Sequence, residues 1–410
     1  MVKRRGGAHV CIVVQNLPVP FDRRVWLECR ALREAGFEVS VVCPKAPGDP
    51  AHQEIEGVHL YKYRPFPPIT RQMLFVAEYA WSILATFLGL LRVWRREPFR
   101  AVQLCNPPDV LWVAAVPFKL LRRVKIVFDQ HDLCPELYQS RFPDGSDAIR
   151  RALLATERLT YLAADRVVST NESYRRKALE RGGKRGDHVA VVRTGPDPTR
   201  MHRGTVDPSV RAGHQYLLAY LGVMGPQDGV DLALQAMHHI VHTRGRHDVA
   251  LILIGDGDAA PSLRALTRTL QLESAVTFTG RVPDAEVRRI LSAADVGLSP
   301  DPRNPLNDVS TMNKTMEYMA HELPVVAFDL VETKVSAQDA AVYARPNSTE
   351  DFGEAVLALL DDEPRRKEMG QAGRVRIEEV LAWRCQAPAY VELYRELVGA
   401  PGAPRDQMPA

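Results

Sequence analysis

The chain has 410 residues, of which 46% are hydrophobic and 25% are charged. This composition is typical of a soluble globular protein, and the length predicts two or three domains. It excludes a collagen, a disulfide-stapled miniprotein and a disordered chain. Residues 1–125 hold 19 Lys and Arg against 10 Asp and Glu, a net charge of +9, whereas the remainder holds 34 against 40, a net charge of −6. The basic N-terminal part indicates an anionic partner there.

Short apolar runs alternate with helical patterns from the N-terminus onward. Arg23–Ala35 has helical spacing and is closed by Gly36. We expect strands at His9–Gln15, Glu38–Cys43, Val58–Tyr63, Ala101–Cys105, Lys125–Asp129, Arg166–Thr170 and His188–Val192. Helices fit between most of these strands, and such alternation predicts a parallel sheet that is covered on both faces.

One segment within this region could be mistaken for a membrane span. Met73–Leu91 is long enough to cross a bilayer and carries a single charge, Glu78. Because Ser82, Thr86 and Gly89 interrupt it, a mostly buried helix is the favoured interpretation. A helix that also enters a membrane surface and a true membrane span remain the alternatives.

The alternation pauses at Asp197–His214, which contains Pro and Gly and little apolar periodicity. We place an interdomain linker at residues 201–214, between an N-terminal domain of residues 1–200 and a C-terminal domain of residues 215–382. In the second domain we expect strands at Tyr216–Leu221, Val249–Gly255, Ala275–Thr279, Val296–Ser299, Pro324–Phe328 and Ala341–Ala344.

The chain closes with an amphipathic helix at residues 383–398, which we expect to pack back towards the N-terminal domain. The Pro- and Gly-rich tail, residues 399–410, is expected to be disordered. Two doubly wound domains should form a cleft between the carboxyl ends of their sheets, where such sheets bind ligands.

The six cysteines contain no Cys-x-x-Cys pair, and several lie in apolar runs. This pattern predicts reduced, buried thiols in a cytosolic protein rather than a disulfide framework or a metal site. The basic N-terminus is followed only by the short apolar run Val10–Val14, so we expect no secretory signal peptide.

Two glycine loops follow strands of the second domain. Gly222 and Gly225 lie between a strand and a helix, where backbone N–H groups can hold an anion, although a simple tight turn uses the same glycines. Gly255-Asp256-Gly257 lacks the third glycine and the downstream acid of a dinucleotide fingerprint, so on its own it favours a structural turn.

The most specific stretch is Asn307–Ala327, a polar loop that enters a helix before a buried strand. Ser310, Asn313, Lys314 and Glu317 recur at three- and four-residue spacing, so we expect them on one helix face. A solvated surface would show the same spacing. A lysine near a helix start suits a phosphate, and a glutamate one turn later suits ribose hydroxyls.

Asp129, His131 and Asp132 form the polar counterpart in the first domain, directly after a strand. A histidine between two carboxylates indicates a polar substrate contact or a general acid or base, against the alternative of a structural histidine. Metal binding is less favoured because no further His or Cys ligands are evident nearby.

Together these motifs are similar to those of a known family. The chain resembles the family 4 retaining glycosyltransferases over about residues 9–398. The stretches that carry the resemblance are Phe128–Asp132, Arg193–Asp197, Ile254–Gly257, Phe278–Val282, Ala293–Val296 and Glu317–Ala320. It implies the GT-B fold, two facing Rossmann-like domains of doubly wound parallel sheets with a C-terminal helix. The C-terminal domain is then expected to hold a nucleotide-sugar and the N-terminal domain the acceptor.

The resemblance also assigns two residues and exposes two departures. His131 matches the family's histidine near the transferred sugar, and Glu317 matches the second Glu of its E-x7-E motif, which is expected on the donor ribose. The first Glu of that motif falls at Val309, where Asp308 or Ser310 could substitute.

The second departure concerns the diphosphate. The Arg and Lys that often hold it in the family's first C-domain loop are replaced by Val223 and Asp228. Lys314 and Arg281 are our candidates for the missing charge. Because lost charge at a phosphate site weakens catalysis, an inactive homologue stays an alternative.

We therefore predict a metal-independent retaining glycosyl transfer that needs no cofactor. The predicted catalytic residues are His131, Lys314 and Asp308, and the predicted substrate contacts are Glu317, Ser310, Asn313, Gly222, Gly225, Gly255, Asp256, Gly257, Arg281 and Asp132. A sugar-nucleotide epimerase and an inactive partner subunit of the same fold are the alternatives.

The expected partners are a nucleotide-sugar donor and a carbohydrate, lipid-linked or small-molecule acceptor. No nucleic-acid recognition motif accompanies the basic residues. We expect a cytoplasmic protein, with peripheral contact to an anionic membrane on the inner face of the plasma membrane as a further prediction. The basic residues on which this rests are Arg71, Arg92, Arg95, Arg96, Arg122, Arg123 and Lys125.

Overall fold

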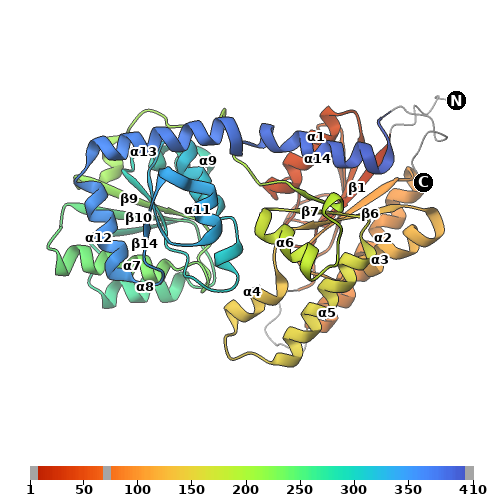
Figure 1. Ribbon diagram of the computed structural model, residues 1–410, viewed down its shortest axis with the longest axis horizontal. Coiled ribbons are helices and arrows are strands. Elements are labelled where there is room, and N and C mark those ends of the chain that lie inside the picture. Colours follow the sequence, from red (N-terminus) through yellow and green to blue (C-terminus); the bar gives the residue numbers. More distant parts are fainter. Residues whose placement is uncertain (1–7, 68–74, 402–410) are drawn as a thin grey trace. The chain divides into compact units, whose positions relative to one another are not determined.

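The computed structural model describes residues 8–67 and 75–401 (Figure 1). The chain divides into two compact units. Unit 1 comprises Met1–Gln139, Asp144–Arg193 and Gln386–Ala410, and unit 2 comprises Ser140–Pro143 and Thr194–Cys385. Arg71 and the start of the helix that we predicted from Met73 lie outside the described residues, as does the tail from residue 402 onward.

Unit 1 is built on an eight-stranded sheet with the order β3-β4-β2-β1-β5-β6-β7-β8. Its strands are β1 His9–Val13, β2 Glu38–Pro44, β3 His52–Ile55, β4 Val58–Tyr63, β5 Ala101–Cys105, β6 Lys125–Gln130, β7 Arg166–Ser169 and β8 Val189–Val191. All pairings are parallel except β3 with β4, which is antiparallel. β3 was not among the predicted strands, and the expectation of a parallel sheet was wrong at this edge.

The helices of this half of the fold are α1 Arg23–Glu34, α2 Phe75–Arg96, α3 Trp112–Arg122, α4 Cys134–Arg141, α5 Asp147–Ala163, α6 Glu172–Glu180 and α14 Trp383–Val398. Helix α1 starts where predicted because the Asp22 carboxylate accepts a hydrogen bond from Val25 N at 3.1 Å and caps the helix. Helix α2 packs on α3, and α3 packs on α5, and the three helices lie side by side (Figure 1).

Alternation along the strands of unit 1 separates an apolar face from a polar one. Val102 and Leu104 of β5 belong to the apolar cluster that includes residues of α2 and α3. Gln103 and Cys105, the residues between and after them, are also buried but carry polar groups. Because successive side chains of a strand point to opposite faces, these polar groups lie on the other face of the sheet.

Helix α2 corresponds to the apolar segment for which a buried helix and a membrane span were both considered. No helix in the described part of the chain is long and apolar enough to cross a membrane. One side of α2 is packed, since Leu90 and Val93 are buried and the Trp94 ring lies 5.1 Å from that of Phe99. Its other side exposes Leu84 and Leu88.

Unit 2 contains a six-stranded parallel sheet with the order β11-β10-β9-β12-β13-β14. Its strands are β9 Tyr216–Leu221, β10 Val249–Ile254, β11 Val276–Gly280, β12 Val296–Ser299, β13 Val325–Phe328 and β14 Ala341–Ala344. Its helices are α7 Val230–His238, α8 Ala260–Thr269, α9 Asp284–Ala293, α10 Asn313–Ala320, α11 Val331–Ala337, α12 Thr349–Leu360 and α13 Glu363–Arg376.

Both faces of this second sheet are covered. Leu218 and Tyr220 of β9 pack into one buried apolar cluster, whereas Leu217 and Ala219 pack into another. This burial on two sides explains why the strands appear in the sequence as continuous apolar runs. The two doubly wound α/β units are those that we expected.

Candidate active site

The predicted donor-side residues of unit 2 follow the carboxyl ends of its strands. Strand β9 lies between β10 and β12, so the loops after β9 and β12 leave the sheet in opposite directions at this point. Such a switch point creates a crevice at the carboxyl edge. Gly222 follows β9, and Lys314 lies at the start of α10 after β12. A Cβ atom placed on Gly222 would lie 3.4 Å from Cε of Lys314, so the two segments meet here.

The glycines of these loops are needed because backbone packs against backbone. Gly255 has φ +129°, and a Cβ atom there would lie 1.9 Å from the carbonyl oxygen of Gly222. A Cβ atom on Gly257 would lie 2.6 Å from the carbonyl oxygen of Met224. Met224 N in turn donates a hydrogen bond to Asp256 O at 3.2 Å. The loops after β9 and β10 are therefore one packed unit.

The charge of Lys314 is already engaged in an ion pair. Its Nζ atom lies 2.5 Å from Oδ1 of Asp301, which is 1% exposed. Burial alone would lower the pKa of Lys314, but the charges of Asp301 and then Asp228 outweigh burial and raise it. Lys314 is thus held as an ammonium between two acidic side chains.

Asp228 also occupies part of the first loop. Its Oδ2 atom accepts a hydrogen bond from Gly225 N at 2.8 Å, so that backbone donor, which we expected to face a phosphate, already has a partner. Burial is the first cause that raises the pKa of Asp228, Lys314 opposes it, and Asp301 adds to it. The loop therefore carries a carboxyl group whose neutral form is favoured relative to an exposed aspartate.

The remaining predicted residues of this site are arranged less uniformly. Helix α10 begins at Asn313, so Ser310 lies in the preceding turn, where its Oγ donates to Leu306 O at 2.8 Å. The expectation that Ser310 shares a helix face with the others was therefore wrong. Asn313 is exposed, whereas Glu317 is half-buried one turn after Lys314.

Asp308 lies in a short 3-10 turn and is already engaged. Its Oδ1 atom accepts a hydrogen bond from Val331 N at 3.2 Å and lies 3.6 Å from Nε of Arg303. Asp256 is exposed, and its Oδ1 accepts a hydrogen bond from Gly257 N at 2.9 Å. Arg281 is exposed directly after Gly280, whose carbonyl accepts a hydrogen bond from Gly255 N at 3.0 Å.

In unit 1 the predicted histidine is held by a buried carboxylate. Nε2 of His131 lies 2.6 Å from Oδ2 of Asp129, and the histidine side chain is 17% exposed. Arg24 of α1 donates to both oxygens of Asp129, from Nη2 to Oδ1 at 2.8 Å and from Nε to Oδ2 at 3.3 Å. Burial alone would raise the pKa of Asp129, but Arg24 and then His131 outweigh it and lower the pKa below its usual range.

Two further elements complete this polar cluster. Gln103 Nε2 donates to Oδ2 of Asp129 at 2.9 Å and to Oε2 of Glu28 at 2.7 Å. On its other side, Gln103 Oε1 accepts hydrogen bonds from the hydroxyls of Tyr390 at 2.7 Å and Tyr394 at 2.5 Å, both on α14. Burial is the main cause that raises the pKa of Glu28, and the Asp129 charge adds to it. The pKa values of the two buried acids are thus shifted in opposite directions, that of Glu28 upward and that of Asp129 downward.

The backbone around His131 is fixed separately. Oδ1 of Asn106 accepts hydrogen bonds from His131 N at 2.7 Å and Asp132 N at 3.1 Å. Nδ2 of Asn106 donates to Asp132 O at 2.7 Å and to Asp109 Oδ1 at 3.0 Å. One side chain therefore sets the direction in which the chain leaves β6.

The same cluster has the composition of a cation site but not its chemistry. Ligand atoms of Glu28, Cys105, Asp129 and His131 lie within 4.8 Å of one another. However, donors from Arg24 and Gln103 already occupy the carboxylate oxygens, and burial raises the pKa of the Cys105 thiol, which disfavours the thiolate that binds metals. We interpret the cluster as an internal ion-pair network.

Sequence reasoning missed most of this network. Arg24 and Glu28 are spaced as an i, i+4 pair on α1, with Nε and Oε1 3.1 Å apart, which is the one local signal the sequence offered. Gln103, Tyr390 and Tyr394 carry no local signal because their partners lie far away in the chain.

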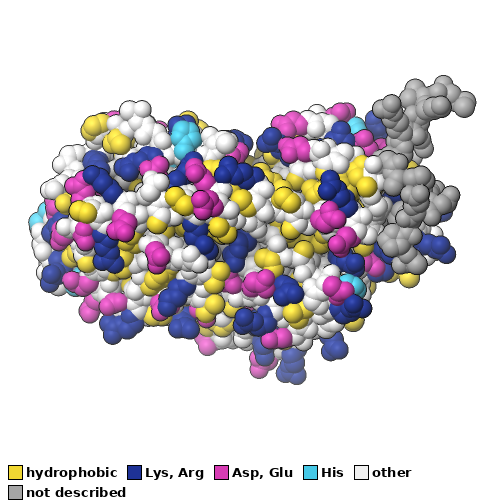
Figure 2. Space-filling model, turned by 45° about the horizontal axis from the view of Figure 1, so that its top comes forward, with side chains coloured by type: hydrophobic (Ala, Val, Ile, Leu, Met, Phe, Trp, Pro, Cys, Tyr) yellow, Lys and Arg dark blue, Asp and Glu magenta, His cyan; other side chains and the backbone are white. Residues whose placement is uncertain are grey.

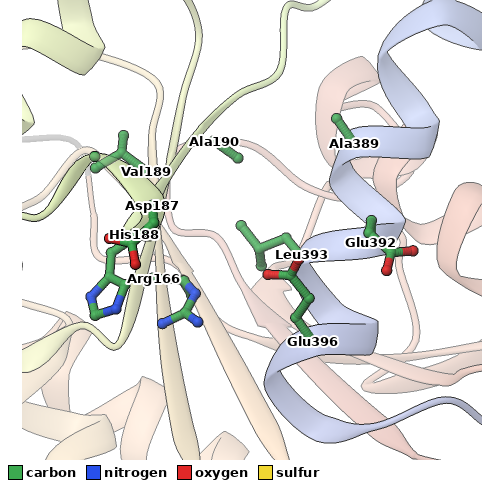
Figure 3. A pocket seen from close by; sticks show the side chains of 10 residues that line it. Arg166, Asp187, His188, Val189, Ala190, Ala389, Glu392, Leu393 and Glu396 are labelled. Carbon is green, nitrogen blue, oxygen red and sulfur yellow. The ribbon is translucent and has the colours of Figure 1, made fainter.

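Unit 1 also contains a cavity of about 300 Å³ (Figure 3). Residues of β7, of the 3-10 turn Gly186–His188, of β8 and of α14 line it, among them Arg166, His188, Glu392 and Glu396. Its lining includes none of the predicted catalytic or substrate-binding residues.

Two family descriptions match the chain. "Glycosyl transferase 4-like domain" matches residues 22–195, and "Glycosyl transferases group 1" matches residues 215–362. Together they cover most of both sheets and the predicted site residues of both units.

Individual relatives agree with this match. The chain is 30% identical to the alpha-maltose-1-phosphate synthase of Mycolicibacterium smegmatis over 263 residues, which is 59% of this chain and 65% of that protein. It thus spans less than two thirds of the length of this curated relative.

Solved structures share the fold. The sucrose-phosphate synthase of Thermosynechococcus elongatus has a TM-score of 0.77 at 18% identity, covering 96% of this chain and all of that one. HepE of Anabaena, solved in complex with UDP-glucose, has a TM-score of 0.68 at 13% identity, covering 94% and 99%.

Proposed function

Because the chain belongs to the family 4 glycosyltransferases of GT-B fold, we propose that it moves a sugar from a nucleotide-diphosphate-sugar to an acceptor with retention of configuration. One observation carries this proposal. At the switch point of the unit 2 sheet, the Gly222 turn meets Lys314, and Glu317 follows one turn later on the same helix.

The donor is proposed to lie at this carboxyl edge. The half-buried Glu317 carboxylate is suited to accept hydrogen bonds from ribose hydroxyls. Lys314 and the exposed Arg281 would face the diphosphate, and Lys314 is positioned for that role by Asp301. HepE, the structural neighbour described with UDP-glucose, supports a nucleotide-sugar as the donor class.

The proposed chemistry needs no metal. The bond between the sugar C1 and the diphosphate oxygen breaks while the acceptor oxygen forms a new bond to C1 from the same face. The acceptor proton passes to the leaving phosphate oxygen. The negative charge that develops on the diphosphate is stabilised by Lys314, Arg281 and backbone N–H groups at the start of α10.

His131 is proposed to contact the transferred sugar or the acceptor. Since Asp129 holds its Nε2, the ring atom that is available to a substrate hydroxyl is Nδ1. Asp129 is a positioning residue in this scheme, because it acts through the imidazole.

The acceptor is proposed to be lipid-linked and used at an anionic membrane surface from the cytoplasmic side. The support is the net charge of +9 over residues 1–125. On the face shown in Figure 2, basic and acidic side chains are interspersed, so this charge does not gather there as a single-sign patch.

Donor binding can be tested before the acceptor is known. We would measure the thermal stability of the full chain with UDP-, GDP-, dTDP- and ADP-sugars, because a ligand that binds the folded state raises the midpoint. Sugar nucleotides with one of these bases should raise the thermal midpoint of the wild type, and Glu317→Ala should abolish this rise. Glu368→Ala, which changes an exposed glutamate on α13, is the control and should keep the shift.

Two outcomes would overturn the proposal. The first is no stabilisation by any sugar nucleotide, and the second is an unchanged shift in Glu317→Ala. Incubation with the stabilising donor alone separates transfer from epimerisation, since an isomerised nucleotide-sugar would establish the latter.

A further inference from the structure

The most exposed large apolar residues in the described part of the chain are two consecutive leucines at the end of α3. Leu120 is 75% exposed and Leu121 is 77% exposed. A single exposed leucine is ordinary, but two adjacent ones at a helix end form an exposed apolar patch.

Exposed leucines at the end of α5 extend this apolar patch. Nζ of Lys119 donates to Ala163 O at 2.8 Å and lies 3.0 Å from Oδ1 of Asp165, so the last turns of α3 and α5 are adjacent. Helix α5 exposes Leu159 and Leu162 there, at 44% and 63%. We call Leu120, Leu121, Leu159 and Leu162 the leucine face.

Three arginines that have no side-chain partner among the described residues are adjacent in sequence to the leucine face. Arg122 and Arg123 directly follow the leucine pair, and Arg158 precedes Leu159. All three are exposed, and none forms a hydrogen bond or ion pair through its side chain with another described residue. The nearby acid, Asp165, is already paired with Lys119.

We propose that the leucine face and its three arginines dock unit 1 on a membrane surface that contains anionic lipids. Leucines at such a surface enter the boundary between headgroups and acyl chains, and arginines beside them face lipid phosphates. Charge complementarity favours this occupant over a second copy of the chain, because a twofold contact would bring the arginines of one copy against those of the other.

This inference rests on the proposed function only in naming the membrane that the acceptor would share. Vesicle binding is measured without donor or acceptor. A failure to bind vesicles would therefore not contradict the proposed transfer reaction. A failure to bind any sugar nucleotide would not contradict the proposed docking face.

The test uses the full chain and sedimentation with vesicles of phosphatidylcholine alone or with phosphatidylglycerol added. The wild type should bind the anionic vesicles about tenfold more tightly than the neutral ones, with loss of binding as NaCl is raised. Leu120→Ser/Leu121→Ser should weaken binding about tenfold. Arg122→Gln/Arg123→Gln should weaken it similarly and flatten the salt dependence.

Matched controls change the same chemistry elsewhere. Val375→Ser/Val380→Ser alters two exposed apolar side chains of unit 2, and Arg268→Gln/Arg365→Gln removes two exposed charges there. Both should bind like the wild type, and circular dichroism would verify that every variant is folded.

Three results would overturn the proposal. They are equal binding to neutral and anionic vesicles, wild-type binding by Leu120→Ser/Leu121→Ser, and loss of binding in both controls. A dimer in light scattering that this leucine variant dissociates would instead assign the face to self-association.

Discussion

The imidazole of His131 and the carboxylate of Asp129 are in contact through Nε2 and Oδ2, 2.6 Å apart, with a single residue, Gln130, between them in the chain. The aspartate is the last but one residue of β6 and is fully buried, whereas the histidine leaves the strand and is partly exposed. A buried anion thus orients a ring that reaches solvent.

Removing this anion should destabilise the protein strongly. Asp129→Asn removes the carboxylate that contacts Arg24, His131 and Gln103, and it leaves Glu28, 3.1 Å from Arg24, as the remaining acidic partner of that guanidinium. Breaking a buried ion pair costs about 3–5 kcal/mol, and the remaining Glu28 contact places the expected loss at the lower end of this range. Urea denaturation would measure the loss. Asp187→Asn breaks the exposed pair with Arg185 and should leave the midpoint unchanged. Equal midpoints for the two variants would refute the assignment of a buried ion pair.

Replacing both tyrosines of α14 should lower the free energy of unfolding by more than the two single replacements added together. Tyr390→Phe or Tyr394→Phe removes one of two hydrogen bonds to Gln103 Oε1, which we expect to cost about 1 kcal/mol. The double variant leaves this buried oxygen with neither bond, so its loss should exceed the sum of the single losses. A double-mutant cycle in urea checks this, with Tyr216→Phe as the control; strict additivity would contradict shared acceptance.

The glycine after β10 should be irreplaceable. Gly255→Ala places a Cβ atom against the Gly222 carbonyl at a φ that alanine disfavours, so we expect a loss of at least about 2 kcal/mol or failure to fold. Gly245→Ala shares a positive φ of +67° but meets no atom within 4 Å. It should therefore show only the backbone cost, about 1 kcal/mol. A comparison of the two thermal midpoints isolates the effect of close backbone packing.

Nucleotide affinity should fall as pH rises. The pKa of Asp228 is raised, first by burial, and an incoming diphosphate would raise it further by like-charge repulsion. Binding then takes up a proton, so affinity is highest below the raised pKa of Asp228 and decreases as pH increases through it. Calorimetry between pH 5 and 8, in two buffers that differ in ionisation enthalpy, would measure the number of protons taken up on binding.

The matched variant for that experiment is Asp228→Asn, which carries no titrating group. It should bind the nucleotide with little pH dependence and more tightly than the wild type at high pH. A wild-type affinity that rises with pH would contradict this account of the loop.

Much of the fold could be predicted because buried parallel strands appear in the sequence as apolar runs. β4, β5, β9, β12 and β14 have the predicted bounds. β3 was missed because His52–Ile55 is short, polar and only partly buried, as expected of an edge strand.

The sites were less predictable, for a physical reason. Position relative to a strand end can be inferred locally, and this placed His131, Gly222 and Lys314 at carboxyl edges. Partners cannot be inferred in this way, so the sequence could not show that Asp301 forms an ion pair with Lys314. Nor could it show that Gln103 contacts both Glu28 and two tyrosines that follow it by almost 300 residues.

The contribution of α14 to unit 1 has a consequence for biosynthesis. Strands β1 to β8 emerge from the ribosome first, yet the hydroxyls that satisfy Gln103 belong to residues 390 and 394 of a 410-residue chain. During translation the Gln103 oxygen therefore lacks these two protein donors until residues 390 and 394 have been synthesised, after all of unit 2. The strands of both sheets precede α14 in the chain, so the docking of this helix is the last step by which unit 1 reaches its complete hydrogen-bond network.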